Sequence, residues 1–352
     1  MLNGVFASLY GDTITLPAFL ITACTSLVLG FLISAVTGCF WVPLMRRLHC
    51  GQTIKTKDGP SWHAKKNGTP TMGGVCFIVG SLVSLGIVFT TLILHMPELF
   101  GTNQDMNLIL CIFSAAAFGA VGFVDDFIKV ILKRNLGLRA WQKIVLQVAI
   151  CMALLLGLYK NGSISTLVRL PIFGTVEFGF LFYPLSMLLI IFMVNAVNLT
   201  DGIDGLASSV TFVVMLGFLV VASLMGYYHL SIYAAALAGA LAGFLVWNFY
   251  PAKTFMGDTG SMFLGGAVVG MAYCMGWPEL LLFMGAVYIW EAGSVVIQVT
   301  YFKITHGKRI FKMTPIHHSF EKSGWSEVKI VSVFSLVALA FVAMGFVYIR
   351  MI

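Results

Sequence analysis

Charged side chains are scarce in this sequence of 352 residues: Asp, Glu, Lys and Arg make up 10% of the chain, whereas apolar residues make up 59%. The mean hydropathy is +0.95. A soluble fold of this length would not keep so much apolar surface away from water, so the composition excludes a soluble protein and indicates a polytopic membrane protein. The net charge of +7 indicates loops that face anionic lipid headgroups, not a nucleic-acid surface.

Several other features are missing. Residues 1–12 contain no Lys or Arg, so the basic region that opens a signal peptide is absent and we expect the first helix to be retained. The seven Cys residues lack metal-ligand spacing, and their odd number argues against a disulfide framework. We interpret them as small buried apolar residues. No repeat, low-complexity tract or long linker divides the chain, so we predict one transmembrane domain over residues 1–352.

Long apolar runs are the main positive feature, and a membrane span needs roughly 20 such residues. We predict spans at about 17–45, 73–96, 108–124, 144–159, 178–197, 206–226, 231–250, 262–277, 280–302 and 330–349. Strands would require alternating polarity and closure into a barrel. The fold class is therefore predicted to be all-α and polytopic, with about ten transmembrane helices and both termini outside.

Positive charge is confined to alternate inter-helix segments. All but three of the 21 Lys and Arg residues lie in one alternating set of segments, which consists of 46–72, 125–143, 198–205, 251–261 and 303–329. An excess of Lys and Arg marks the cytoplasmic face of a membrane protein. The same set of segments contains five Asp residues that have no simple structural partner in the sequence, namely Asp125, Asp126, Asp201, Asp204 and Asp258. We therefore expect an active site at the cytoplasmic surface, which suits an enzyme that joins a cytosolic reactant to a lipid.

Two adjacent acids, Asp125 and Asp126, follow the third span. Neighbouring carboxylates at a membrane boundary repel each other unless a cation, a proton or a Lys compensates them, and Lys129 lies one helical turn away. The alternative is an interfacial stop signal, but such signals usually employ Lys or Arg. We interpret the pair as functional.

Segment 195–207 (NAVNLTDGIDGLA) is a polar break between two strongly apolar runs. Asp201 and Asp204 share a face if the turn is helical. Asn, Asp and Gly also build ordinary hairpin turns. However, Asn198 and the two acids leave negative charge without a nearby Lys or Arg, which a bound cation or a donor-rich ligand would balance.

Segment 248–261 (NFYPAKTFMGDTGS) places Asp258 in a turn rich in Gly and hydroxyl groups. Mg²⁺ prefers oxygen ligands, typically one or two carboxylates with substrate phosphates and water, and Asp258 fits that role. Backbone N–H groups of such a turn suit phosphate. Phe255 either stacks on a base or anchors the chain at the membrane interface.

Segment 313–321 (MTPIHHSFE) places His317 and His318 side by side in the largest basic loop. Adjacent His residues do not both face one metal from a regular helix, which argues against zinc. We predict that the two His residues are donors to a phosphate or to a carboxylate-bearing substrate.

At the start of the second span, Lys65 and Lys66 lie near Thr71, where they either hold a diphosphate or reach toward headgroups.

Glu291 is the one acid that the sequence places inside a span. We interpret it as a protonated or hydrogen-bonded group near a helix kink. The broken apolar pattern over residues 291–300 predicts a bend in this span, which would open a lateral path for a lipid.

In this order, the blocks from Gly68-Thr69-Pro70-Thr71-Met72-Gly73-Gly74 to the His segment closely resemble the phospho-N-acetylmuramoyl-pentapeptide transferase family over essentially the whole chain. The wider superfamily of polyprenyl-phosphate N-acetylhexosamine-1-phosphate transferases shares the acidic blocks, whereas segment 315–318 (PIHH) resembles the muramoyl-pentapeptide branch. Ser319 stands where that family commonly has a third His. The resemblance implies transfer of phospho-MurNAc-pentapeptide from UDP-MurNAc-pentapeptide to undecaprenyl phosphate in peptidoglycan synthesis, with release of UMP. It also implies Mg²⁺, a homodimer and the bacterial inner membrane.

The resemblance further implies a role for each matching residue. Asp258 would bind Mg²⁺, and Asp125 would be the base toward the lipid phosphate, supported by Asp126. The implied nucleotide and sugar-phosphate pocket consists of Asn198, Asp201, Asp204, Asn248 and Phe255. The groups implied to neutralise diphosphate or lipid phosphate are Lys66, Thr71, Lys129 and Lys143. His317 and His318 would complete the site.

Two alternatives stay open from the residues. A polyprenyl-phosphate GlcNAc-1-phosphate transferase would share the acidic blocks, so only the His segment and a donor assay discriminate. A secondary transporter would place its site near the bilayer midplane on repeated, broken helices, whereas here the acids lie at one surface and no repeat is present.

Overall fold

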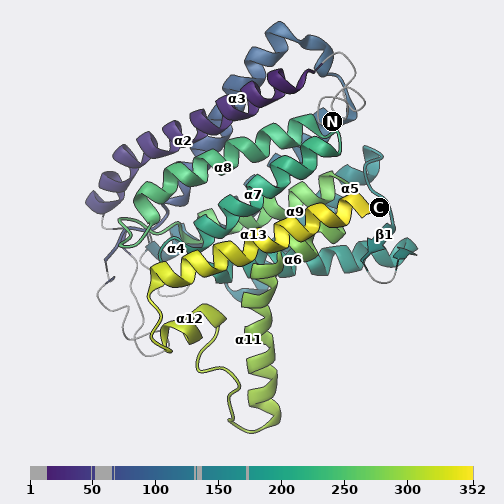
Figure 1. Ribbon diagram of the computed structural model, residues 1–352. Coiled ribbons are helices and arrows are strands. Elements are labelled where there is room, and N and C mark those ends of the chain that lie inside the picture. Colours follow the sequence, from purple (N-terminus) through teal and green to yellow (C-terminus); the bar gives the residue numbers. More distant parts are fainter. Residues whose placement is uncertain are drawn as a thin grey trace.

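Figure 1 shows the computed structural model of the chain, which describes residues 14–48, 50–51, 66, 68–130, 132, 137–171 and 174–351. Its regular structure is almost entirely helical, so the predicted all-α class is confirmed. Within these ranges eight helices are long and apolar enough to cross a membrane, and a bent pair of helices is a ninth candidate. Residues 1–12, which carry the prediction about a signal peptide, lie outside the described residues, as do Lys65 and Asn67.

The long helices are α2 (Leu16–Arg47), α3 (Gly74–His95), α4 (Asn103–Val130), α5 (Ala140–Lys160), α6 (Phe182–Thr200), α7 (Leu206–Leu224), α8 (Tyr228–Asn248), α9 (Gly257–Cys274), α11 (Ala286–Ile304) and α13 (Glu327–Met351). The short elements are η2 (Pro97–Leu99), β1 (Leu167–Leu170), β2 (Gly174–Glu177), η3 (Gly179–Leu181), η4 (Pro278–Leu280), α10 (Leu281–Met284) and α12 (Ile316–Glu321). Nine of the predicted spans correspond to one long helix each, whereas the predicted span 280–302 covers α10 and most of α11, which are separated by a bend. However, α9 is outside the set of membrane-spanning candidates, so the count of ten is not confirmed.

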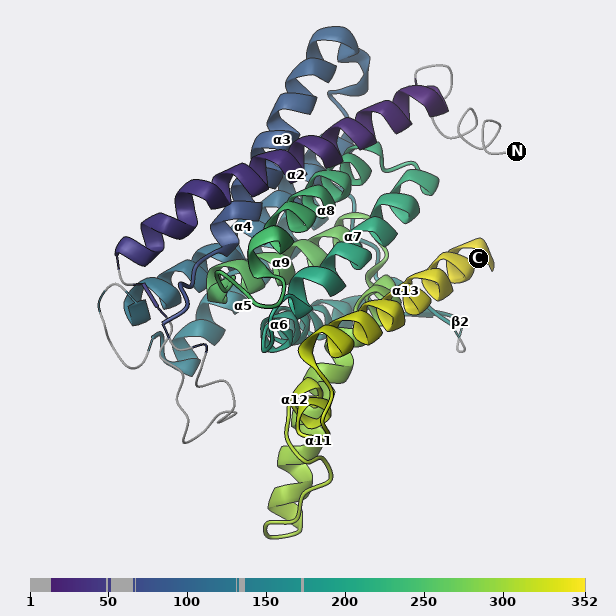
Figure 2. The ribbon, with the colours of Figure 1, turned by 60° about the vertical axis from the view of Figure 1, so that its left-hand side comes forward.

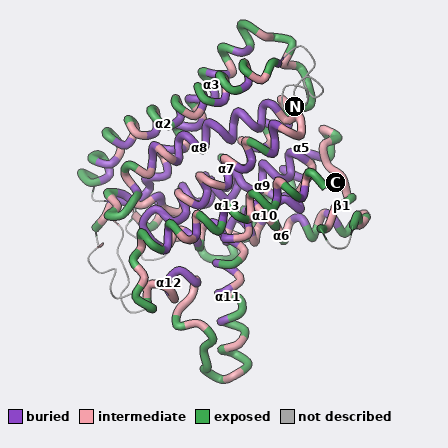
Figure 3. The backbone as a smooth tube through the Cα atoms, viewed as in Figure 1, coloured by how far each residue is buried: buried purple, intermediate pink, exposed green. Residues whose placement is uncertain are grey.

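Helix α9 lies at the centre of the bundle, and it is buried continuously from Thr259 to Cys274 (Figure 3). Glycines let α4 approach it closely. A Cβ atom on Gly122 would lie 2.0 Å from the carbonyl oxygen of Asp258, and one on Gly266 would lie 2.6 Å from that of Ser114. Small residues at helix crossings allow this kind of backbone approach in membrane proteins. The crossing brings the C-terminal turns of α4 beside the N-terminus of α9.

Helix α4 is longer than the predicted span 108–124, because it continues to Val130. Asp125, Asp126 and Lys129 therefore lie within the last two turns of a helix, not after its end. At the opposite end of the bundle, β1 and β2 form an antiparallel hairpin with Leu167 opposite Glu177. The Tyr348 hydroxyl, near the end of α13, donates a hydrogen bond to the Arg169 carbonyl, which places the C-terminal end of α13 at the hairpin (Figure 1).

The predicted bend over residues 291–300 is wrong in position. The chain turns by 81° between α10 and α11, and Gly285 is the residue between these helices. A Cβ atom on Gly285 would lie 2.3 Å from Cε of Met193, so a side chain at the bend would collide with α6. Beyond the bend α11 is one continuous helix that projects from the bundle, with α12 beside it (Figure 2).

The cysteine interpretation holds for five of the seven residues. Cys50, Cys76, Cys111, Cys151 and Cys274 are buried, and all seven are free thiols. The interpretation is wrong for Cys24 and Cys39, which are exposed on α2. Both lie on the outward face of this helix, where apolar side chains such as Phe40 are also exposed.

Candidate active site

The two acids at the end of α4 have different partners. Asp125 is fully buried, and its Oδ1 atom accepts a hydrogen bond of 2.7 Å from the backbone N–H of Leu138. Its Oδ2 atom forms ion pairs with Lys129 and, at 3.0 Å, with Lys143. The predicted pairing of Lys129 with the acidic pair is therefore confirmed for Asp125.

Asp126 instead holds the N-terminus of α9. Its Oδ2 atom accepts hydrogen bonds from the backbone N–H and the hydroxyl of Thr259 at 2.8 and 2.7 Å. Its Oδ1 atom accepts one of 3.2 Å from the backbone N–H of Asp258. The first N–H groups of a helix have no partner within the helix, and an acidic acceptor there is favourable. Asp126 thus acts as a cap supplied by a neighbouring helix.

Asp258 is the point at which four helices meet. Its Oδ2 atom lies 2.9 Å from Nζ of Lys129 and 3.0 Å from Nζ of Lys143. Its Oδ1 atom accepts a hydrogen bond of 3.0 Å from the Asn198 amide. We name this group the acid–lysine cluster, and it consists of Asp125, Lys129, Lys143, Asn198 and Asp258.

The acid–lysine cluster has the donor set for a bound Mg²⁺ ion. Within the part of the chain that the structure describes, no three His, Cys, Asp or Glu side chains converge as a metal site. Two carboxylates do converge on the same ammonium groups. One or two carboxylates, completed by phosphate oxygens and water, are the usual protein ligands of Mg²⁺. The residues therefore fit an ion that a phosphorylated substrate helps to hold.

Lys66 and Asp204 form a second ionic group with an acid that the sequence analysis did not select. Nζ of Lys66 lies 2.7 Å from Asp204 and 2.6 Å from the carboxylate of Glu327, the first residue of α13. The same carboxylate accepts a hydrogen bond of 2.9 Å from the backbone N–H of Asp204. The loop after α6 is therefore tied both to Lys66 and to the start of α13.

Asp201 lies in the same loop, with a different electrostatic environment. Residues 201–205 form turns and not a helix, so Asp201 and Asp204 do not share a helical face. Burial raises the pKa of Asp201 to about 8, and repulsion by Asp258, Asp126 and Asp204 adds to the shift. The raised pKa favours the neutral form of the Asp201 carboxyl group beside the carboxylates of Asp204 and Asp258.

Buried polar groups stabilise the loop that precedes α9. The oxygen of the Asn248 amide accepts from the Ser208 hydroxyl at 2.8 Å, and its nitrogen donates to the Thr254 carbonyl at 3.0 Å. Asn248 is 1% exposed, so the structure uses it to support the loop. The half-buried Phe255 is fixed by its backbone N–H, which donates to the Pro70 carbonyl at 2.8 Å. Thr71 is buried close to Gly257, at the start of α9.

The two histidines lie on α12, each against a different acid. Nδ1 of His317 lies 3.0 Å from Oε2 of Glu291 on α11. Nδ1 of His318 lies 2.6 Å from Oε2 of Glu321. A Cβ atom on Gly202 would lie 2.2 Å from Nε2 of His317, which places this imidazole directly beside the loop that follows Asp201.

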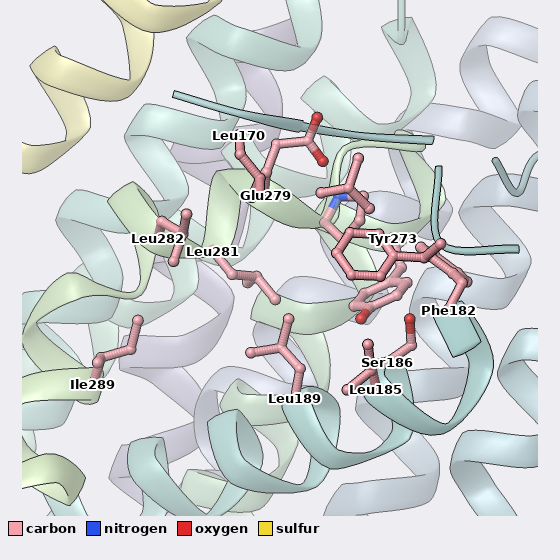
Figure 4. Close-up of a pocket in the computed structure, with 13 residues that line it drawn as sticks. Leu170, Phe182, Leu185, Ser186, Leu189, Tyr273, Glu279, Leu281, Leu282 and Ile289 are labelled. Atoms are coloured by element: carbon pink, nitrogen blue, oxygen red, sulfur yellow. The ribbon is translucent and has the colours of Figure 1, made fainter. Parts of the chain in front are cut away.

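A separate cavity of about 180 Å³ lies away from these residues (Figure 4). Its lining is mainly apolar and includes Leu170, Phe182, Leu185, Leu189, Tyr273 and Leu282. Leu170 belongs to β1, so the cavity is at the hairpin end. None of the residues predicted to form the site lines it.

Comparison with known proteins decides the family. A phospho-N-acetylmuramoyl-pentapeptide-transferase of Clostridium botulinum (strain Eklund 17B / Type B) is 45% identical over 327 residues, which cover 93% of this chain and 96% of that protein. The chain belongs to the phospho-N-acetylmuramoyl-pentapeptide-transferase family. Relatives of the same name from Clostridioides difficile (strain 630) and Halalkalibacterium halodurans are 44% and 42% identical. They cover 89% and 92% of this chain, and the matches span 93% and 96% of their own lengths.

Two family patterns fall on the groups described above. Signature 1 of the phospho-N-acetylmuramoyl-pentapeptide-transferase family matches residues 66–78, which include Lys66 and Thr71. The model of Glycosyl transferase family 4 matches residues 108–276, the part of the chain that contains the acid–lysine cluster. Membership of this family confirms the resemblance found in the sequence and favours the transferase prediction over the transporter alternative.

Two acids at this end of the molecule were missed or misjudged from the sequence. Glu327 occupies the first position of a helix, where an acid is usually explained by the helix dipole. Glu291 was interpreted as a protonated or hydrogen-bonded group near a kink. The hydrogen bond is confirmed, because Nδ1 of His317 lies 3.0 Å from its Oε2 atom, but the kink is at Gly285. The sequence did contain a signal for this contact: Glu291 is an acid inside an apolar span, and the nearby His pair offers it a partner.

Proposed function

We propose that the protein transfers phospho-MurNAc-pentapeptide from UDP-MurNAc-pentapeptide to undecaprenyl phosphate, with release of UMP. The relatives that share most of its length carry the name of this activity. The single observation that supports the chemistry is the acid–lysine cluster, in which Asp125 and Asp258 share the ammonium groups of Lys129 and Lys143. Phosphoryl transfer depends mainly on alignment and charge neutralisation, which such a cluster supplies.

In the proposed reaction, an oxygen of the lipid phosphate bonds to the phosphorus that carries the sugar, and the bond from this phosphorus to UMP breaks. Lys129 and Lys143 neutralise the charge on the phosphate oxygens. Asp125 accepts the proton of the lipid phosphate, and Asp258 would hold Mg²⁺, which supplies further charge neutralisation when bound. Asp126 keeps Asp258 in place through the start of α9.

The remaining predicted residues are assigned to the nucleotide and sugar side. Asn198 already contacts Asp258, and Asp201 and Asp204 line the next loop. Lys66 would exchange one of its two carboxylate partners for a donor phosphate. Phe255, Thr71 and His318 lie on segments that border these groups, and the support from Asn248 keeps the loop of Phe255 in position.

The experiment measures UMP release by the purified protein in detergent, with undecaprenyl phosphate and Mg²⁺. UDP-MurNAc-pentapeptide is compared with UDP-GlcNAc, and Asp258→Asn is compared with the matched variant Asp105→Asn, at the other end of α4. We expect turnover of the muramoyl donor alone, lost in Asp258→Asn, retained in Asp105→Asn, and abolished by EDTA until Mg²⁺ is returned. Turnover of UDP-GlcNAc would assign the protein to the sibling transferases, and no turnover of either donor would refute the proposal.

We also propose that the site faces the cytoplasm from the bacterial inner membrane, because the sequence concentrates Lys and Arg in one alternating set of segments and their described members Lys66, Lys129 and Lys143 lie at the candidate site. Lys253 is exposed at this end and Glu98, in η2, is exposed at the other. In a background with Cys24 and Cys39 replaced by Ala, an impermeant maleimide should label Glu98→Cys in intact spheroplasts. It should label Lys253→Cys only after permeabilisation, and the reverse pattern would overturn this orientation. The homodimer implied by the family resemblance stays a prediction.

A further inference from the structure

Glu291 and His317 form a buried pair that the proposed roles do not explain. Both residues are 0% exposed. Glu291 comes from α11, beyond the bend, whereas His317 comes from α12, and the two side chains meet at 3.0 Å through Oε2 and Nδ1. Burial of a carboxylate is costly even when it is paired, so the pair needs a reason.

The acid determines which nitrogen of the imidazole is available. A carboxylate oxygen accepts a hydrogen bond, so Nδ1 of His317 carries the hydrogen whether the ring is neutral or protonated. Nε2 is then the only ring nitrogen that is free to act. It is an acceptor in the neutral ring and a donor in the protonated ring.

Nε2 has no partner among the described residues, although it is buried. It lies beside Gly202, because a Cβ atom at that position would be 2.2 Å away. The groups around the ring are Glu291 on one side, the loop that begins at Asp201 on the other, and the ring of His318, whose centroid lies 4.1 Å away. An unpartnered buried nitrogen that faces a loop of the candidate site is what a ligand contact would use.

We propose that Glu291 is a positioning residue, which holds His317 so that Nε2 meets a polar group of the bound UDP-linked donor. This inference rests on the proposed function. Carboxylates commonly orient a functional imidazole in this way, by fixing its tautomer and its ring plane. Helix α11, which lies beyond the bend at Gly285, therefore contributes to the site, because it carries the acid that orients His317.

The test is a double-mutant cycle on kcat/KM for UMP release, with wild type, Glu291→Gln, His317→Ala and the double variant. Glu291→Gln preserves the side-chain shape and removes the charge. We expect it to lower kcat/KM by about 10–100-fold, as removal of an orienting partner typically does. If Glu291 acts only through His317, the double variant will equal His317→Ala. Independent losses that multiply, or an unchanged rate in Glu291→Gln, would overturn the inference.

Glu279→Gln is the matched control, because Glu279 is also a buried acid but lies at the hairpin end, against Arg169. It should retain wild-type turnover, and all variants should keep the wild-type thermal unfolding temperature in detergent to within a few degrees. A second measurement decides the case in which His317→Ala has no turnover. Glu291→Asp keeps the carboxylate and should recover part of the rate lost in Glu291→Gln, and equal rates in these two variants would refute the positioning role. An inactive wild type would instead refute the proposed function.

Discussion

The carboxylate of Asp126, on α4, caps the N-terminus of α9 through the backbone N–H and the hydroxyl of Thr259, at 2.8 and 2.7 Å. Asp258 immediately precedes Thr259 in the chain, and its backbone N–H also donates a hydrogen bond to Asp126. Asp126, which the sequence analysis assigned to the catalytic group, therefore fixes the start of α9 and so positions Asp258 against Lys129 and Lys143. The neighbouring Asp125 faces the two lysines directly.

Removal of the cap should reduce stability together with activity. Asp126→Ala leaves three donors of α9 without an acceptor, and loss of a helix cap costs about 0.5–2 kcal/mol. Asp126→Asn keeps one acceptor oxygen and should lie between Ala and wild type. Thermal unfolding in detergent and UMP release measure the two effects. Lost activity in Asp126→Ala with an unchanged unfolding temperature would show that Asp126 acts chemically and not as a cap.

Lys129 and Lys143 should be jointly required. Each contacts both Asp125 and Asp258, so Lys129→Met or Lys143→Met leaves one ammonium for two carboxylates and a phosphate. We expect kcat to fall by about 10²-fold in each, the usual scale for loss of one charge-stabilising group. Lys160→Met, at the other end of the helix that carries Lys143, is the control. An equal loss in this control would indicate a general effect of charge on the protein.

Gly202→Ala should interfere with His317. The added Cβ atom would lie 2.2 Å from Nε2 and 2.6 Å from Cε1 of a ring that Glu291 holds in place. Displacement of a site group by about 1 Å can cost about 10²-fold in rate, and we expect a loss of that order in kcat/KM. In a His317→Ala background the same substitution should have no further effect. Gly86→Ala, where a Cβ atom meets nothing within 4 Å, should behave as wild type, and a similar loss there would contradict the explanation.

Asp201 should make the folded protein less stable as the pH rises. Its pKa is raised from 3.8 to about 8 in the folded state, so the folded protein holds a proton that the unfolded chain has lost between these values. The contribution to stability is complete below pH about 4 and is lost as the pH rises through about 8. Asp201→Asn removes this dependence. The difference in unfolding temperature between Asp201→Asn and wild type should therefore increase from pH 5 to pH 8 and then level off, and a constant difference would show that Asp201 is ionised throughout.

The sequence was informative about the site because charge is costly in and near a membrane. Asp125 and Asp258 were recognisable for that reason, and the spacing of four residues between Asp125 and Lys129 correctly predicted an ion pair. The partners of Lys66 and His317 were not recognisable in the same way. Lys66 and Glu327 are 261 residues apart, and Glu291 and His317 are separated by 26 residues and a loop. No local spacing relates such pairs.

Composition and local pattern alone determined the membrane class, the helical fold and the end of the bundle at which the polar residues gather, since these depend on hydrophobic length and on the cost of isolated charge. Tertiary structure decided what each acid does. The close crossing of α4 and α9 through Gly122 makes Asp126 a cap and brings Asp258 to the lysines. The bend at Gly285 directs α11 away from the bundle, so that Glu291 reaches His317. Both outcomes depend on how closely the helices pack and on where the chain turns. Local sequence patterns specify neither of these.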